Sequence, residues 1–269
     1  MNSRLPYELI VTDFDGTLIL DGRQENVAAD LVTELVAMRA AGARWVIATG
    51  RGLNDLLHPL SQLSLPIAPD AVVVDDLRVY VLRGQTYTPM VAYNDFRRQH
   101  REVRWSRFEA RLNRFRDDCV QDGAAVWHPE TAPWGLEVGD ELVLALFAEK
   151  FACQFADAAD LILARNGAWA VPAVRGDDKG GAVGALRALW GIAATRTLVA
   201  GDDLNDLSMM VREVAGRWVA PANAVGEVRR RVLGAAEGYL AREVGSAGVA
   251  EGLQVGNGAN AQRTASFGR

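Results

Sequence analysis

The chain has few of the residues that build disulfide frameworks and zinc sites. Its 269 residues include two cysteines and three histidines. Cys119 and Cys153 lie far apart, form no Cys-x-x-Cys pair and have no cluster of histidines nearby. A disulfide scaffold and a structural zinc site therefore have little support, and we expect two idle or buried thiols.

Long apolar runs and nucleotide-binding loops are also absent. No apolar run approaches the roughly 20 residues that span a bilayer, and the segment before residue 7 lacks a signal-peptide core. There is no Gly-x-x-x-x-Gly-Lys-Ser/Thr loop and no Gly-x-Gly-x-x-Gly after a strand. The net charge of -5 argues against broad attraction to nucleic acid. We expect a cytoplasmic monomer or small homo-oligomer whose partner is a small molecule, not nucleic acid or a membrane.

What is present is an alternation of strand-like and helix-like segments at both ends of the chain. About half of the residues are hydrophobic, enough for a full core. Apolar runs typical of buried parallel strands alternate with stretches of helical periodicity, which predicts a parallel α/β sheet. Expected strands cover residues 9–12, 44–49, 71–74, 197–200 and 217–220, and expected helices cover 28–41, 181–190, 204–211 and 225–241.

The middle of the chain differs in composition and predicts an inserted second domain. From residue 83 to 174 the sequence shifts toward arginine and aromatic residues. Within it, an apolar stripe and an arginine stripe recur at helical spacing, which predicts one amphipathic helix. For the arginines, we prefer a solvated helix face over an anion-binding role. The apolar stripe is Trp105, Phe108, Leu112 and Phe115, and the arginine stripe is Arg97, Arg101, Arg104, Arg107, Arg111 and Arg114.

Four short motifs fall at the ends of the expected core strands. They are Asp13-Phe14-Asp15-Gly16-Thr17, Thr49-Gly50-Arg51, Lys179-Gly180 and the stretch from Gly201 to Asp206. Ligands bind outside the carboxyl ends of parallel strands, so these motifs should converge on one site.

The residue types in these motifs suit phosphoryl transfer through an aspartyl phosphate. Asp13 is the natural nucleophile, and Asp15 can protonate the leaving oxygen and later activate water. Side chains of Asp13 and Asp202 with the backbone carbonyl of Asp15 form an oxygen-only set that suits Mg²⁺. Lys179 can neutralise phosphate oxygens, and the Thr49 hydroxyl with nearby backbone N–H groups can bind them.

This ordered set resembles the haloacid dehalogenase superfamily, specifically its Cof-like and sucrose-phosphatase-like phosphatases with a large cap. The resemblance implies a Rossmann-like parallel-sheet α/β core over residues 1–82 and 175–254, an inserted α+β cap over 83–174, and a flexible tail over 255–269. It implies a Mg²⁺-dependent phosphatase acting on a small phosphorylated metabolite, preferably a sugar phosphate.

The same resemblance assigns residue roles. Asp13, Asp15 and Lys179 would be catalytic, and Asp13, Asp15 and Asp202 would hold the metal. Phosphate-binding residues would be Thr49, Gly50, Arg51 and Asn205, with Asp206 in a supporting role.

Several alternatives stay open at this point. A phosphomutase resembling phosphomannomutase would carry the same motifs, and an aspartyl-phosphate signalling module is a further, non-enzymatic possibility. Where many Cof-like members have Asn-Gly-Ala, this chain has Asp75-Asp76-Leu77. The acidic pair could bind sugar hydroxyls or a substrate amine. The preferred interpretation is a solvated turn. Asp203 is expected to cap a helix, and Asp177 and Asp178 to be solvated loop charges.

Overall fold

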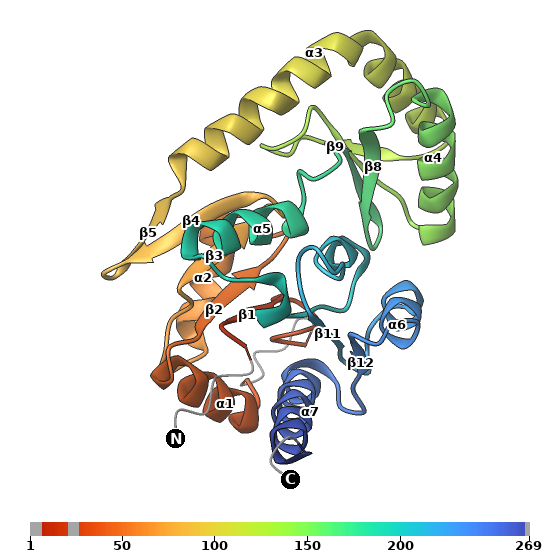
Figure 1. Ribbon diagram of the computed structural model, residues 1–269. Coiled ribbons are helices and arrows are strands. Elements are labelled where there is room, and N and C mark those ends of the chain that lie inside the picture. The colour runs from red at the N-terminus through yellow and green to blue at the C-terminus, as the bar shows by residue number, and fades with distance from the viewer. Residues whose placement is uncertain (1–6, 21–26, 267–269) are drawn as a thin grey trace. The chain divides into compact units, whose positions relative to one another are not determined.

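The computed structural model describes residues 7–20 and 27–266, with side chains to residue 255, and divides the chain into two compact units (Figure 1). The core unit is Met1–Met90 with Lys179–Arg269, and the inserted unit is Val91–Asp178. These junctions lie beyond the expected boundaries at residues 83 and 174. The first junction lies later because residues 83–89 complete a hairpin that pairs with the core sheet.

The core unit is built on one eight-stranded sheet with β1 near its centre. The strand order is β12-β11-β10-β1-β2-β3-β4-β5, parallel from β12 to β3 and antiparallel for the last two strands. The strands are β1 (Leu9–Thr12), β2 (Arg44–Ala48), β3 (Ala71–Val74), β4 (Arg78–Arg83), β5 (Thr86–Pro89), β10 (Thr197–Ala200), β11 (Arg217–Ala220) and β12 (Gly238–Leu240).

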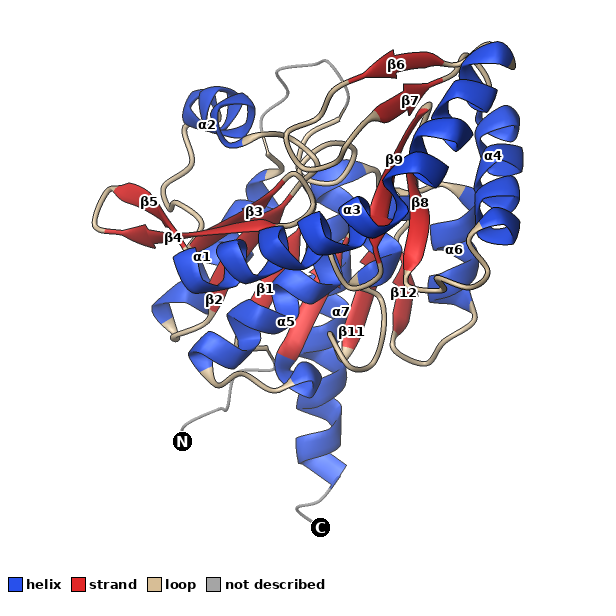
Figure 2. Cartoon of the chain, turned by 90° about the horizontal axis from the view of Figure 1, so that it is seen from above, coloured by secondary structure: helices blue, strands red, loops and turns tan. Residues whose placement is uncertain are grey.

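Helices cover this sheet on both faces, so its central strands are buried on both sides (Figures 1 and 2). Alternate strand residues such as Ile10, Ile47 and Leu198 pack in one cluster with Leu31 of α1 and Leu253 of α7. The core helices are α1 (Ala29–Ala40), α2 (Leu53–Gln62), α5 (Lys179–Trp190), α6 (Gly226–Leu233) and α7 (Gly245–Ser266), with 3₁₀ turns η1 (Ala194–Arg196) and η2 (Leu204–Ser208).

One expectation for the end of the core unit is wrong. The helix expected over 225–241 stops at Leu233, and β12 follows, because Gly234 ends the helix and the backbone of Val232 lies too close to Gly238 for any side chain there. Helix α7 runs to Ser266, into the segment expected from Val255 as a flexible tail, and residues 267–269 of that segment lie outside the described residues.

The inserted unit has its own sheet and its own hydrophobic core. Four antiparallel strands in the order β6-β7-β9-β8 pack with two helices. The predicted helix is confirmed as α3, with Leu112 and Phe115 buried and Trp105 and Phe108 partly buried. The elements are α3 (Val91–Gln121), β6 (Ala125–Trp127), β7 (Gly135–Glu137), α4 (Glu141–Gln154), β8 (Leu161–Asn166) and β9 (Trp169–Val174). The predicted fold class, a mainly parallel α/β core with an α+β insertion, is confirmed.

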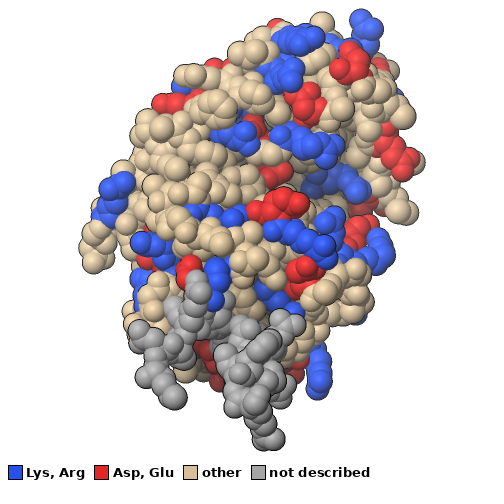
Figure 3. Space-filling model, in the orientation of Figure 1, with Lys and Arg blue, Asp and Glu red and all other residues tan. Residues whose placement is uncertain are grey.

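The arginine stripe of α3 is more than a solvated face, as far as the inserted unit is described. Arg97 and Arg101 pair with buried Asp177 at 2.8 and 3.7 Å, and Arg104 pairs with Asp160 at 2.6 Å. The expectation that Asp177 is a solvated loop charge is therefore wrong, since these arginines compensate its burial. On the face drawn in Figure 3, positive and negative side chains are interspersed.

Among the described residues, no helix is both long and apolar enough to cross a membrane.

Candidate active site

The predicted site residues of the core unit lie at the carboxyl edge of its sheet. Asp13 follows β1, Thr49 follows β2, and Asp202 comes two residues after β10 ends. Lys179 is the first residue of α5. Adjacent parallel strands bring their carboxyl ends together, so segments distant in sequence meet here.

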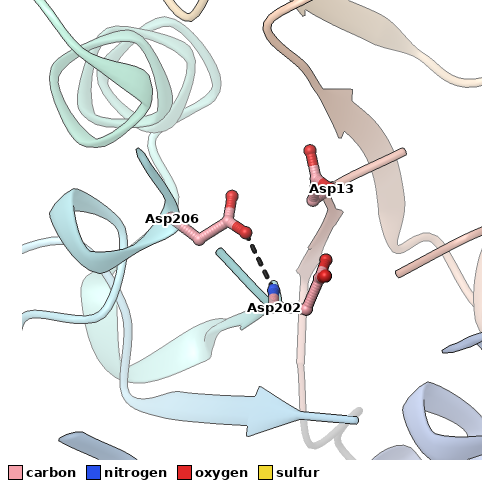
Figure 4. Close-up of side chains that lie close together, drawn as sticks. All are labelled: Asp13, Asp202 and Asp206. Atoms are coloured by element: carbon pink, nitrogen blue, oxygen red, sulfur yellow. Dashed lines mark hydrogen bonds between the residues drawn. The ribbon is translucent and has the colours of Figure 1, made fainter. Parts of the chain in front are cut away.

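A buried lysine between two carboxylates forms the centre of the site. The Lys179 ammonium donates to Asp13 Oδ1 at 2.6 Å and to Asp206 Oδ1 at 2.7 Å. The side chains of Lys179 and Asp206 are 0% exposed and that of Asp13 is 8% exposed. Asp13, Asp202 and Asp206 each offer an oxygen within 4.8 Å of the others, and their side chains face a shared space (Figure 4).

Asp206 also organises the loop that carries Asp202. Its second oxygen, Oδ2, accepts hydrogen bonds from the backbone N–H groups of Asp202 at 2.9 Å and Asp203 at 3.1 Å. Asp203 accepts from the N–H of Leu204 at 2.6 Å in a capping box, so its expected role as a helix cap is confirmed. Gly201 is required here, because a Cβ at that position would clash with the Asp206 carboxylate.

The site carries more negative than positive charge, and its pKa shifts follow from that. Burial raises the pKa of Asp13 well above its usual range, Asp206 and Asp202 raise it further, and Lys179 opposes them. Burial and Asp206 raise the pKa of Asp202 to about 7. Burial alone would lower the pKa of Lys179, but Asp13, Asp206 and Asp76 hold it well above its ordinary value. The site has three carboxylates and one ammonium, and the carboxylates offer only oxygen atoms as ligands. This excess of negative charge and this ligand type fit a hard divalent cation.

Asp202 is held by groups on two other loops. It accepts a hydrogen bond from the Thr17 hydroxyl at 2.7 Å, and Asn223 Nδ2 lies 3.4 Å from its other oxygen. Asn223 follows β11, donates to the Gly16 carbonyl at 2.7 Å and was not anticipated from the sequence. Its position after a core strand was the available signal. Gly16 has a φ of 74°, and a Cβ there would clash with Asp202.

Arg51 and Asp15 form a bidentate ion pair beside this cluster. Arg51 Nε and Nη2 donate to the two Asp15 oxygens at 2.7 and 2.6 Å. The hydrogen bond to Asp15 raises the pKa of Arg51 above its ordinary value. The Arg51 N–H donates to the buried Thr49 hydroxyl at 3.1 Å, and Gly50 between them is exposed. Arg51 therefore orients the carboxylate expected to handle the proton.

Asp76, Asn205 and Lys179 form a second group of contacts in the core unit. Asn205 Nδ2 donates to Asp76 Oδ1 at 3.0 Å, and the same oxygen lies 3.7 Å from Lys179 Nζ. The preferred expectation of a solvated turn is therefore wrong for Asp76. Asp75 instead accepts from Arg78 Nε at 2.7 Å.

Comparison with known proteins gives one family and a consistent fold. The family model of sucrose-6F-phosphate phosphohydrolase matches residues 6–122 and 165–255. A search of curated proteins finds no match.

Solved structures match over nearly the whole chain at low identity. The sucrose-phosphatase of Synechocystis sp. PCC6803, in complex with sucrose and phosphate, is 19% identical with a TM-score of 0.71, covering 94% of this chain and 99% of that one. A protein from Streptococcus mutans UA159 is 16% identical with a TM-score of 0.66, covering 95% and 99%. A phosphatase of the haloalkanoate enzyme superfamily from Bacteroides thetaiotaomicron is 17% identical with a TM-score of 0.58, covering 96% and 99%. These likenesses show a shared fold.

Proposed function

Because the chain belongs to the sucrose-6F-phosphate phosphohydrolase family of phosphoric monoester hydrolases, we propose that it is a Mg²⁺-dependent sugar-phosphate phosphatase acting through an aspartyl phosphate. The observation that carries the proposal is the buried Lys179, held between Asp13 and Asp206 at 2.6 and 2.7 Å. A buried carboxylate fixed beside an ammonium is placed to meet a phosphoryl group, and Lys179 opposes the rise in the pKa of Asp13 that burial causes.

In the first step Asp13 attacks phosphorus while Lys179 holds its Oδ1. A new bond joins an Asp13 oxygen to phosphorus, and the bond from phosphorus to the sugar oxygen breaks. Asp15 gives its proton to that leaving oxygen. To carry this proton, Asp15 must give up one of the two hydrogen bonds that it accepts from Arg51.

In the second step water releases the phosphate. Asp15, now ionised and again paired with Arg51, accepts a proton from a water molecule, whose oxygen attacks phosphorus. The bond between phosphorus and Asp13 breaks, which restores the carboxylate and frees inorganic phosphate. Throughout, the Thr49 hydroxyl and Lys179 bind phosphate oxygens.

Side chains of Asp13 and Asp202 and the Asp15 carbonyl are the proposed Mg²⁺ ligands. When bound, Mg²⁺ would neutralise the carboxylates and the phosphate oxygens. The chain's own contribution is to hold Asp202 by Thr17, at 2.7 Å, beside Asp13.

A sugar phosphate is the proposed substrate class because the family description names one, and sucrose 6-phosphate is the first ester to test. The family match leaves residues 123–164 of the inserted unit uncovered. Those residues contain β6, β7 and α4, so the sugar itself is left to experiment.

We expect the protein to release phosphate from one or more sugar phosphates with Mg²⁺ and to lose this activity with a chelator. The measurement is phosphate release over a panel of sucrose, hexose, polyol and nucleotide phosphates. Isomerisation of a hexose 1-phosphate without free phosphate would instead establish the mutase. Turnover that persists after complete chelation would refute metal dependence.

We expect Mg²⁺ to bind about tenfold more weakly at pH 6 than at pH 8, since only ionised carboxylates bind a cation. With its pKa at about 7, Asp202 carries a proton at pH 6 and is ionised at pH 8. The measurement is a titration of the melting temperature with Mg²⁺ at the two pH values. Equal apparent affinities at both would contradict the assignment of Asp202.

The pH dependence of the stability of the metal-free protein is the control for this prediction. Because the folded pKa of Asp202 lies above the ordinary value of 3.8, its contribution to stability is present below pH 3.8 and is lost as the pH rises through about 7. Asp202→Asn should remove this pH-dependent contribution and the stabilisation by Mg²⁺ together.

A further inference from the structure

The turn between β3 and β4 has an unusual backbone and is tied to the active-site loop. Asp75 and Asp76 have φ angles of 52° and 60°, a left-handed region that Asp tolerates better than larger residues. Their N–H groups donate to the carbonyls of Arg51 at 2.9 Å and Thr49 at 3.0 Å. The turn is thus fixed to the loop after β2, and its side chains have defined directions.

The two aspartates of this turn make different contacts. Asp76 Oδ1 accepts from Asn205 at 3.0 Å and lies 3.7 Å from Lys179 Nζ, with a side chain 33% exposed. Asp75 pairs with Arg78, next along its own hairpin. Asp76 therefore adds a further carboxylate to the lysine that also holds Asp13 and Asp206.

That extra carboxylate has an electrostatic cost for phosphate binding. A phosphate dianion that approaches Lys179 also approaches Asp76, and like charges repel. A carboxylate can accept about four hydrogen bonds, and a hydroxyl that donates to it offsets the repulsion. A substrate without a nearby donor has no such compensation.

From this geometry we infer that Asp76 is a specificity-determining residue, which selects phosphate esters with a hydroxyl close to the ester and disfavours esters without one. The inference rests on the proposed function and concerns the same site. It assigns to the core unit itself a contact with the sugar portion of the substrate.

Asp76→Asn provides the test, since it removes the charge and keeps an acceptor for Asn205 and a residue that tolerates positive φ. For the sugar phosphate that the wild type hydrolyses best, kcat/KM should fall by about 10-fold or more, in line with loss of a hydrogen bond to a charged group. For p-nitrophenyl phosphate, which lacks a hydroxyl, KM should fall and kcat/KM should rise. Inorganic phosphate should inhibit the variant more strongly than the wild type.

Asp75→Asn is the matched control, because it changes the same atoms in the same turn at a residue paired with Arg78. This variant should leave unchanged the ratio of kcat/KM for the sugar phosphate to kcat/KM for p-nitrophenyl phosphate. An equal loss for both substrates in Asp76→Asn would mean that Asp76 only positions Lys179 and Asn205, and would overturn the inference. The inference would also be overturned if Asp76→Asn had the melting temperature of the wild type and an unchanged ratio of the two kcat/KM values.

The wild-type measurements separate this inference from the proposed function. Phosphate release from either ester by the wild type supports the proposed function whatever Asp76→Asn does. Release from neither ester would overturn the proposed function and the inference with it.

Discussion

Replacing Asp13 with Asn is expected to lower turnover of phosphate esters by on the order of 10⁴-fold or more, the range found for loss of a catalytic nucleophile. The amide keeps the shape of the side chain and an oxygen for Lys179, which donates to Oδ1 at 2.6 Å in the wild type. It cannot form the acyl phosphate. Because the site already holds excess negative charge, loss of this carboxylate should not lower the melting temperature of the metal-free protein.

Steady-state phosphate release and mass spectrometry of acid-quenched reactions measure this effect. The wild type should show a phosphate adduct at Asp13, and Asp13→Asn should show none. Asp122→Asn, at an exposed position paired with Lys150, is the matched control and should retain full activity. Substantial turnover by Asp13→Asn would contradict the assignment of the nucleophile.

Replacing Lys179 with Met is expected to destabilise the core unit by roughly 3–5 kcal/mol, the cost of breaking a buried ion pair. The variant leaves Asp13 and Asp206 buried without their shared cation, at side-chain exposures of 8% and 0%. Activity should also fall by on the order of 10²–10³-fold, because a preorganised charge at the phosphate is lost. Denaturant unfolding followed by circular dichroism measures the first effect, and phosphate release the second.

Lys150→Met is the control for this substitution. Lys150 lies 3.4 Å from Asp122 with side chains 40% and 56% exposed, and exposed pairs contribute about 0–1 kcal/mol. Added Mg²⁺ should recover part of the stability of Lys179→Met, since it can compensate the same carboxylates. A Lys179→Met protein as stable as the wild type would show that these carboxylates are not ionised in the fold.

The resemblance to haloacid dehalogenase phosphatases, drawn from four motifs, is confirmed by the family match. Three of those motifs could be found because each is a short string after a core strand, as with Asp13 after β1 and Thr49 after β2, whereas Lys179 begins α5. Their meeting follows from parallel pairing, which brings β10 and β2 to either side of β1.

Other features depend on partners that no local pattern reveals. The C-terminal part of the expected helix over 225–241 became β12 because it pairs with β11 and because Gly238 lies against Val232. Asp177 had the appearance of a loop charge, and only the folded inserted unit places it under Arg97 and Arg101. Asn223 has no motif and acts through contacts with Gly16 and Asp202.

By itself, the sequence determined the fold class and the phosphatase family of this protein, because the hydrophobic periodicity and the motifs can be recognised in the sequence without knowledge of tertiary contacts. Only the tertiary structure decided how the charges are shared: Asp206 with Lys179 and two backbone amides, Asp15 with Arg51, and Asp76 with Asn205. The physical reason is that burial makes an unpaired charge costly, and the partner that compensates it comes from whichever distant segment the fold brings within hydrogen-bonding distance.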